Sequence, residues 1–399
     1  MTNVLKEQIR EIQDDVIRIR RYLHQNPELS NHEAATSRFI QEKLTEYGIA
    51  FQTGYAKHGV LGIIKGTQPG KVVALRADMD ALPIQELNDH PFTSNYANVM
   101  HACGHDAHTA MLLGAGHVLQ QMREQLKGTI LLVFQPAEED SPNGGSKVML
   151  DDGVFAEYTP DVIYGQHVWP DLPVGQFGIR DKEMMGASDR FEITLSGKGG
   201  HASMPHQTND VMVAAGHLIT SLQTIVSRSL DPLEASVVTI GTIHGGEAAN
   251  IIPNQVTLEG SIRTYSPIIR KRLKERFFTI TNQVAQVFEA KAAITYLDGY
   301  PATINTPKWA NVARLAAQKI NGETPNVSPS LAGEDFSRFL ENYPGTFIWL
   351  GTQIDIPEEQ APLHDAHFKL NERALPIGTS LLVQVAIDTL EKLAKEENE

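Results

Sequence analysis

The sequence predicts an α/β protein in which a mostly parallel central sheet is interrupted by an inserted ferredoxin-like α+β domain. Early in the chain, short unbroken apolar runs, typical of buried parallel strands, alternate with segments of helical periodicity. From residue 190 the apolar and polar residues alternate, and the elements follow the order β-α-β-β-α-β. The first pattern then returns. We therefore expect a discontinuous domain of residues 1–183 and 297–399, with an inserted domain of residues 184–296.

The discontinuous domain is expected to hold alternating helices and buried strands. Apolar residues recur every three or four positions from Leu5 to Leu23, which predicts an amphipathic first helix. Further helices are expected over residues 33–47, from residue 110, and over 308–320 and 375–395. Strands are expected over residues 60–64, 72–77, 129–134, 161–165 and 345–351.

The inserted domain shows the alternation expected of half-exposed antiparallel strands. Its strands are expected over residues 190–195, 236–243, 255–263 and 292–296, and its helices over 210–226 and 268–289. A glycine-rich stretch, Gly197 to Gly200, permits a flexible loop before His201. This stretch lacks the Lys-Ser/Thr signature that a phosphate-binding loop requires.

Composition and length limit the classes of function. The chain has 399 residues, and its 48 acidic against 34 basic residues give a formal charge of −14. This balance argues against a nucleic-acid or acidic-membrane partner. Residues 1–21 lack an apolar signal-peptide core, and no apolar segment reaches membrane-spanning length. A single cysteine excludes an internal disulfide. These features together predict a cytoplasmic protein.

The most informative stretch is residues 101–108, His-Ala-Cys-Gly-His-Asp-Ala-His. It holds three histidines, a carboxylate and the only cysteine of the chain. Thiolate, imidazole and carboxylate are the side chains that bind divalent transition metals. The alternative is a polar loop before a helix, with Asp106 as the cap. We favour a metal site, because no structural requirement brings so many ligand types together.

Further ligand-type residues follow the predicted strands. Asp78 and Asp80 come after strand 72–77, and Glu138 and Glu139 after strand 129–134. His167 lies just past the end of the next predicted strand. Since the carboxyl ends of parallel strands meet at one sheet edge, these side chains are expected to converge there. Each motif alone also fits a turn or a solvated acidic loop.

Taken in order, these motifs resemble those of the dinuclear metal amidohydrolases of the aminoacylase and carboxypeptidase type. The matching branch is that of hippurate hydrolase, indole-acetyl-amino-acid hydrolases and N-acetyldiaminopimelate deacetylase. The resemblance covers almost the whole chain, and it implies a zinc-peptidase-like catalytic domain with an inserted lid or dimerisation domain. The motifs are Asp78-Met79-Asp80, Cys103-Gly104-His105-Asp106, Glu138-Glu139, His167, Gly199-Gly200-His201, Asn250-Ile251-Ile252-Pro253 and His364.

The resemblance also implies a role for each matching residue. Glu138 matches the general base, and Asp80 matches the acid that steadies the metal site. His201 matches the residue of the inserted domain that polarises the scissile carbonyl, whereas Asn250 and Arg263 match positions that hold the substrate carboxylate. The implied metal ligands are Cys103, His105, Glu139, His167 and His364.

The implied activity is hydrolysis of N-acyl-amino acids, with two divalent ions per subunit and a homodimer formed through the inserted domain. The ions expected are zinc, manganese, cobalt or nickel. A dipeptidase or carboxypeptidase uses the same ligand set and stays open as an alternative. Two other classes fit less well: a silent relative that only binds a metal or small acid, and a zinc-stabilised structural protein. One departure from the pattern of this branch is that the segment of residues 140–161 is a few residues longer than usual, which bears on the match of His167. The assignment of His167 rests on its being the only histidine of this region.

Overall fold

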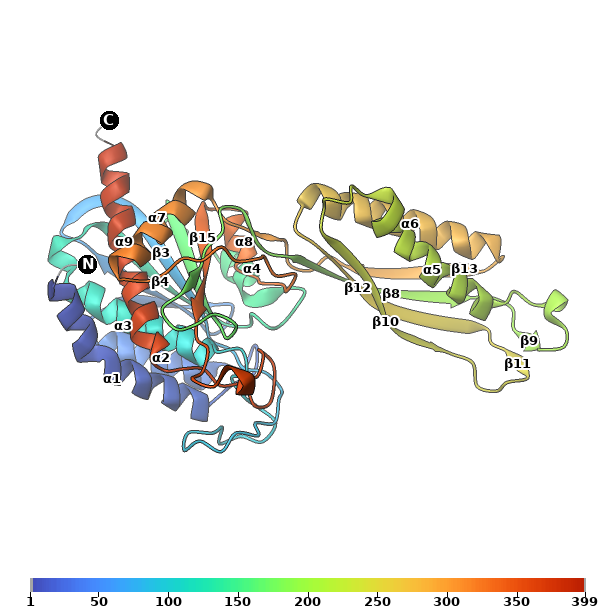
Figure 1. The fold of residues 1–399 in the computed structure, drawn as a ribbon, viewed down its shortest axis with the longest axis horizontal. Helices are drawn as coiled ribbons and strands as arrows, with labels where there is room; N and C mark the ends of the chain where they lie inside the picture. Colours follow the sequence, from blue (N-terminus) through green and yellow to red (C-terminus); the bar gives the residue numbers. More distant parts are fainter. Residues whose placement is uncertain (1–2, 398–399) are drawn as a thin grey trace. The chain divides into compact units, whose positions relative to one another are not determined.

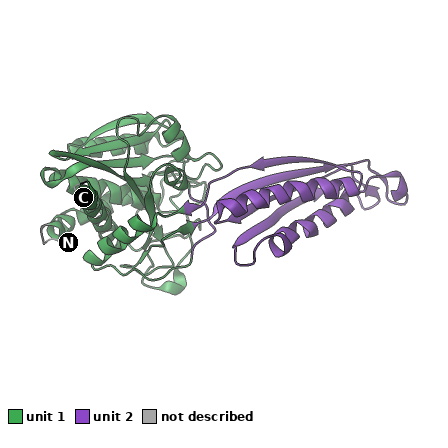
Figure 2. Cartoon of the chain, turned by 90° about the horizontal axis from the view of Figure 1, so that it is seen from above, with its two compact units in different colours: residues 1–184, 304–328, 335–399 green, residues 185–303, 329–334 purple. Residues whose placement is uncertain are grey.

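The computed structural model describes residues 3–397, which fold into two compact units (Figure 2). Unit 1 comprises the residues up to Met184, Ile304–Ser328 and the residues from Asp335 onward. Unit 2 comprises Met185–Thr303 and Pro329–Glu334. The first two and last two residues of the predicted discontinuous domain lie outside the described range.

Unit 2 includes residues beyond the predicted boundary at 296. The chain after this point still bonds to the first strand of the unit, because the N–H of Ser188 donates to the carbonyl of Tyr300 at 3.0 Å. A later segment returns as well, since the N–H of Gly186 donates to the carbonyl of Ala332 at 3.0 Å. These backbone bonds explain why residues 329–334 belong to unit 2.

Unit 1 is built on a seven-stranded sheet with the order β1-β2-β4-β3-β5-β15-β6. The strands β4, β3, β5 and β15 are parallel, and the outer strands pair antiparallel. The sheet is therefore mostly parallel at its centre, as predicted. The strand bounds are Ala50–Tyr55 (β1), Gly59–Lys65 (β2), Gln68–Asp78 (β3), Lys127–Gln135 (β4), Val162–Trp169 (β5), Phe177–Gly178 (β6) and Gly345–Gly351 (β15).

The helices of unit 1 follow the apolar periodicity of the sequence. The apolar stripe of the first helix is buried throughout, from Leu5 to Leu23. The helix bounds are Asn3–Gln25 (α1), Ala34–Glu46 (α2), His105–Gln121 (α3), Gly144–Asp151 (α4), Pro307–Lys319 (α7), Ser337–Leu340 (α8) and Ala374–Glu396 (α9). No helix within residues 3–397 is long and apolar enough to cross a membrane.

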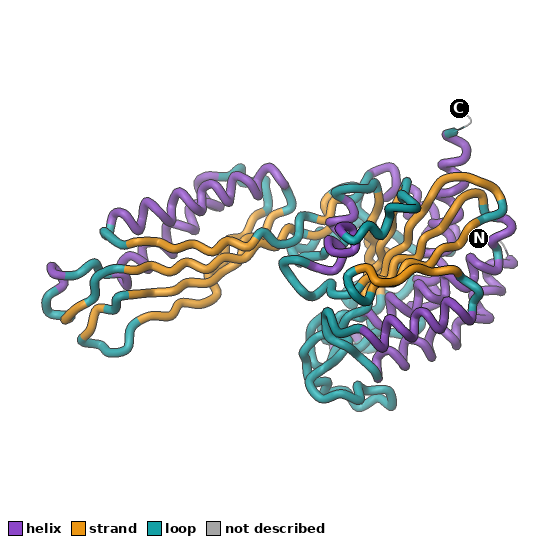
Figure 3. Tube along the Cα trace, turned by 180° about the vertical axis from the view of Figure 1, so that it is seen from behind, coloured by secondary structure: helices purple, strands orange, loops and turns teal. Residues whose placement is uncertain are grey.

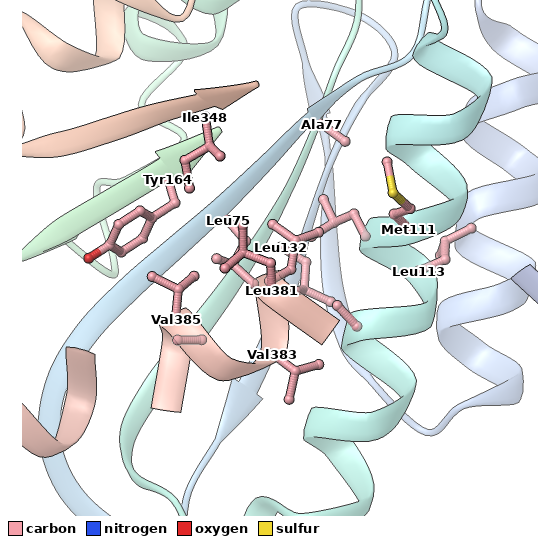
Figure 4. Packing of buried hydrophobic residues seen from close by; sticks show 14 of the residues in the cluster. Leu75, Ala77, Met111, Leu113, Leu132, Tyr164, Ile348, Leu381, Val383 and Val385 are labelled. Carbon is pink, nitrogen blue, oxygen red and sulfur yellow. The ribbon is translucent and has the colours of Figure 1, made fainter. Parts of the chain in front are cut away.

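The core of unit 1 lies where α3 and α9 pack against the central strands (Figure 4). Side chains from the two helices and the sheet meet there, and all of the following are buried: Leu75, Leu132, Tyr164, Met111, Leu113, Leu381, Val383 and Val385. The hydroxyl of Tyr164 is paired with the hydroxyl of Thr389 at 2.9 Å, so its burial leaves no polar group unsatisfied.

Unit 2 holds an antiparallel sheet with the order β10-β12-β8-β13, which is the strand order of a ferredoxin-like fold. Its helices α5 and α6 cover one face of this sheet (Figures 1 and 3). Asp210 caps α5 and Ser266 caps α6. The bounds are Ala187–Ser196 (β8), Val211–Ser229 (α5), Ser236–Gly245 (β10), Gln255–Thr264 (β12), Pro267–Val287 (α6) and Lys291–Leu297 (β13).

Several elements and boundaries of unit 1 differ from the prediction. The edge strand β1, the two-residue strand β6 and the short helix α4 were not predicted; β1 is largely exposed and has no alternating apolar pattern. The helix expected from residue 110 begins at His105. The strand predicted over residues 161–165 continues to Trp169, since β5 stays paired with β15 up to the Trp169–Gly351 pair. His167 therefore lies inside a strand and not past its end.

Candidate metal centre and active site

The predicted ligands of unit 1 gather at the carboxyl edge of the parallel strands. Asp78 ends β3 directly beside Gln135, the last residue of β4, and Glu138 and Glu139 follow this point. His167 approaches from the neighbouring strand β5. Parallel pairing thus brings side chains from three strands to one edge, as the sequence indicated.

Gly104 lets the cysteine–histidine loop approach β5. Its φ is +84°, and a Cβ at this position would lie 2.4 Å from Cγ2 of Val168. Any other residue would push the loop away from the strand. Gly104 thus places Cys103 and His105 next to His167.

The five predicted ligands lie close together. The Cys103 sulfur is 3.4 Å from Nε2 of His167 and 3.3 Å from Nε2 of His364. Oε1 of Glu139 lies 3.2 Å from the same nitrogen of His364 and 4.0 Å from Nε2 of His105. Two overlapping triplets result, Cys103–His105–His167 and Cys103–Glu139–His364, with ligand atoms within 4.8 Å of one another. Cys103 belongs to both triplets.

Neighbouring groups orient the ligands. Nδ1 of His105 bonds to the carbonyl of Asp80 at 2.9 Å and lies 3.2 Å from its carboxylate, which leaves Nε2 directed into the site. The Asp80 carboxylate also accepts from the N–H of Glu139 at 3.0 Å and from the hydroxyl of Ser30 at 2.6 Å. Partners of this kind fix the ring orientation of metal-binding histidines.

The charges around the histidines favour a cation. Burial alone would lower the pKa of His105, but the carboxylates of Asp78 and Asp80 raise it to about 10. Burial and the neighbouring His108 keep the pKa of His167 well below its usual range, so that ring stays neutral. The carboxylates of Asp78 and Asp80 therefore give the site a negative potential, and the neutral ring of His167 offers an unprotonated nitrogen to a cation.

The residues present fit a divalent transition metal. His105 is 1% exposed, and its Nε2 has no hydrogen-bond partner within the described part of the chain. A buried nitrogen of this kind is costly unless something binds it. Thiolate, imidazole and carboxylate are moreover the ligand types of zinc and its neighbours in the first transition row.

Glu138 is buried beside these ligands, with 7% of its surface exposed. Its Oε1 accepts from the N–H of Asp335 at 3.2 Å. The preceding residue, Ala137, has a φ of +54°, and its N–H donates to Glu33 at 2.8 Å. The turn that carries the two glutamates is therefore held by side chains and backbone groups from remote segments.

The sequence did not indicate two buried residues behind this site, Arg76 and Asp335. They form a continuous hydrogen-bonded set with Asp78 and His108, which the ligand-type motifs had already singled out. The sequence contexts of Arg76 and Asp335 predict only a strand and a turn or the start of a helix. The signal in the sequence was an arginine inside an otherwise apolar strand, which usually requires a buried partner.

The three predicted residues of unit 2 do not form one cluster. His201 lies on the short strand β9 (Gly200–His201), which pairs with β11 (Ile251–Ile252) directly after Asn250. Arg263 instead lies near the far end of β12, opposite Ser188. The strand from Gln255 to Arg263 corresponds to a length of about 26 Å.

The sequence of this chain matches the model of the family described as peptidase family M20/M25/M40 over residues 74–388. The chain belongs to this family, and the predicted class, a metal-dependent amidohydrolase related to metallopeptidases, is confirmed.

Three relatives illustrate the match. The N-acetyl-L-cysteine deacetylase of Bacillus subtilis (strain 168) is 42% identical over 94% of this chain and 88% of the relative. Thermostable carboxypeptidase 2 of Saccharolobus solfataricus is 38% identical over 96% and 97%. The crystal structure of Bacillus subtilis YXEP, a dinuclear metal binding peptidase from the M20 family, is 35% identical, with a TM-score of 0.84 and coverage of 96% and 99%.

Proposed function

We propose that this chain hydrolyses the amide bond of N-acyl-amino acids with two divalent ions bound at the carboxyl edge of the unit 1 sheet. The observation that carries this proposal is the convergence of ligand atoms from four separate segments next to Glu138. A structural zinc site would close with nearby Cys and His pairs. The proposed ligands are Cys103, His105, Glu139, His167 and His364.

Glu138 is the proposed general base. Two bound divalent ions would polarise the substrate carbonyl and lower the pKa of a bound water. The Glu138 carboxylate accepts a proton from the attacking water and later donates it to the leaving amine. Its bond from the N–H of Asp335 orients the carboxylate for this transfer. Asp80 holds His105 in place through the entire cycle.

His201 is the proposed donor to the oxyanion. Its Nδ1 accepts from the N–H of Ser203 at 3.1 Å and lies 2.8 Å from the Ser203 hydroxyl. The proton of the neutral ring is then on Nε2, which can donate to a developing negative charge. Asn250 lies beside His201, since its carbonyl accepts from the N–H of Ala202 at 3.0 Å. We assign Asn250 to substrate binding.

We further propose that the protein acts as a homodimer. Arg263 is a suitable bidentate partner for a substrate carboxylate. About 26 Å of β12 separates it from Gln255, the end of β12 that follows the β9–β11 pair with His201. One unit 2 cannot place both residues on one small substrate. We therefore assign the two residues at each site to different subunits, so that His201 of the partner subunit completes the site.

The substrate class follows from the ligand set and the relatives. One relative is named a deacetylase of N-acetyl-L-cysteine, and another is named a carboxypeptidase. Both names describe cleavage of an amide bond, and an acyl group or an aminoacyl residue can occupy the same place in the substrate. We place N-acyl-amino acids first, because the relative named as an N-acetyl-L-cysteine deacetylase has the higher identity of the two. Carboxypeptidase action on small peptides is the second candidate.

A substrate panel tests the proposed function. The chelated protein is reloaded separately with zinc, manganese, cobalt or nickel, and then assayed on N-acetyl, N-benzoyl and longer N-acyl amino acids and on dipeptides. We expect metal-dependent release of free amino acids from the N-acyl compounds. Preferential cleavage of the dipeptides would favour the second candidate. Lack of cleavage of either class by protein that carries two ions per chain would refute both.

A further inference from the structure

Arg76 occupies an unusual position under the proposed catalytic residues. It lies on β3, is 2% exposed, and its guanidinium contacts the last residues of β3 and β4. Each of its three nitrogens donates a hydrogen bond: Nε to Gln135 at 2.8 Å, Nη1 to Asp78 at 2.7 Å and Nη2 to Asp335 at 2.8 Å. A planar guanidinium can bind both carboxylates at once, which a lysine ammonium cannot do with the same geometry.

The Asp335 side leads to the proposed general base. The Asp335 carboxylate is held by Arg76, by the amide of Gln135 at 2.7 Å and by the N–H of Ser146 at 3.0 Å. The same residue donates its own N–H to Oε1 of Glu138 at 3.2 Å. Fixing the Asp335 side chain thus also fixes the backbone donor that orients Glu138.

The Asp78 side leads to a proposed metal ligand. The N–H of Val168 donates to Nε2 of His108 at 2.8 Å, which places the proton of the neutral ring on Nδ1. That Nδ1 donates to the Asp78 carboxylate at 2.6 Å. Val168 directly follows His167, so Arg76 reaches the end of β5 through two intermediate side chains.

We propose that Arg76 is a positioning residue, whose guanidinium joins the Glu138 turn to the His167 end of β5 by binding Asp335 and Asp78 together. The inference rests on the proposed function in taking Glu138 as the general base and His167 as a metal ligand. Loss of the guanidinium releases Asp335 and moves the donor that orients Glu138. A displacement of about 1 Å at a catalytic group can reduce the rate about 10²-fold.

Kinetics on metal-loaded enzyme test this inference with N-acetyl-L-cysteine as the probe. Arg76→Met is expected to lower kcat about 10²-fold while KM changes little, because substrate binding does not involve Glu138. Arg76→Lys keeps the buried positive charge, so it is expected to fold even where the Met variant does not. Its kcat loss should be smaller but clear, since an ammonium cannot hold both carboxylates with the geometry of the planar guanidinium.

A double variant separates positioning from a general structural role. Glu138→Gln alone should lower kcat ~10²–10⁴-fold. If Arg76 acts through Glu138, adding Arg76→Lys to this variant should cost less than about threefold more. The same loss from Arg76→Lys in both backgrounds would overturn the inference and leave the proposed function intact. Full kcat in Glu138→Gln would instead refute the assigned base.

Crystal structures of the same variants give a readout that does not depend on activity. We expect the 3.2 Å contact between Asp335 and Glu138 to be lost or lengthened in Arg76→Lys. Arg180→Met is the matched control, because within residues 3–397 the Arg180 side chain bonds to the carbonyls of Glu183 and Val327 and to no catalytic group. It should keep both the contact and kcat. An unchanged contact in Arg76→Lys would overturn the inference.

Discussion

The substitution Glu33→Gln is expected to stabilise unit 1 at neutral and alkaline pH. Glu33 is fully buried; its Oε1 accepts from the N–H of Ala137 at 2.8 Å, and its Oε2 has no hydrogen-bond partner among residues 3–397. Burial, with a further contribution from the negative charge of Asp80, raises the pKa of Glu33 from 4.5 to about 7. Ionised Glu33 is therefore a destabilising feature of the fold.

The sign and size of the effect follow from linkage. Between pH 4.5 and about 7 the folded protein keeps a proton on Glu33 that the unfolded chain has lost, so stability falls as the pH rises through this window. Above the folded pKa, Glu33 is ionised in both the folded and the unfolded state, and the loss of unfolding free energy stays at its full value. The rise of the Glu33 pKa from 4.5 to about 7 corresponds to a loss of about 3 kcal/mol, because each pKa unit is equivalent to ~1.36 kcal/mol.

Glutamine removes the charge but keeps an oxygen that can accept from Ala137. We therefore expect the free energy of unfolding of Glu33→Gln to exceed that of the wild type by up to about 3 kcal/mol at about pH 8. At about pH 5 the two free energies of unfolding should differ by less than about 1 kcal/mol. Urea unfolding of the chelated full-length protein measures this difference. Tryptophan fluorescence follows unit 1 alone, since Trp169, Trp309 and Trp349 all belong to it.

The control is Glu11→Gln, which removes one carboxylate charge from the exposed face of α1. If the gain in Glu33→Gln were equal at both pH values, ionisation of Glu33 would not be its cause. A loss of stability at about pH 8 would show that the carboxylate charge itself holds Ala137 in its positive-φ conformation.

Three further predictions concern the site itself. Cys103→Ala should lose both its bound metal, measured by mass spectrometry, and its activity; retention of both would show that Cys103 is not a metal ligand. Glu138→Gln should keep metal and lose turnover ~10²–10⁴-fold, whereas Glu139→Ala should lose metal; the reverse result would exchange the two roles. His201→Ala should bind metal normally and lose about 10²–10³-fold in rate. Mixing it with Glu138→Gln should restore activity through heterodimers, and an inactive mixture with proven subunit exchange would refute the cross-subunit role.

The sequence by itself determined the elements and the ligand types. Apolar periodicity is a local property, so it predicted α1, the buried strands and the β-α-β-β-α-β order of the insert. Ligand chemistry is also local: the Cys-Gly-His-Asp stretch and the paired glutamates are sufficient to indicate a metal site. The edge strand β1 was not predicted, because its exposed residues show no such pattern.

Only the tertiary structure decided which residues support that site. Arg76 and Asp335 are 259 positions apart in the sequence, and no local sequence pattern predicts their contact. Their contact exists because parallel strand pairing and the return of the chain after unit 2 bring them to one edge. The pairing of His201 with Ile251, which places His201 at the opposite end of β12 from Arg263, was equally not predictable, since strand register is a property of paired segments. The chemical type of a residue is a property of its own side chain, but its partners depend on packing between segments that are remote in the sequence.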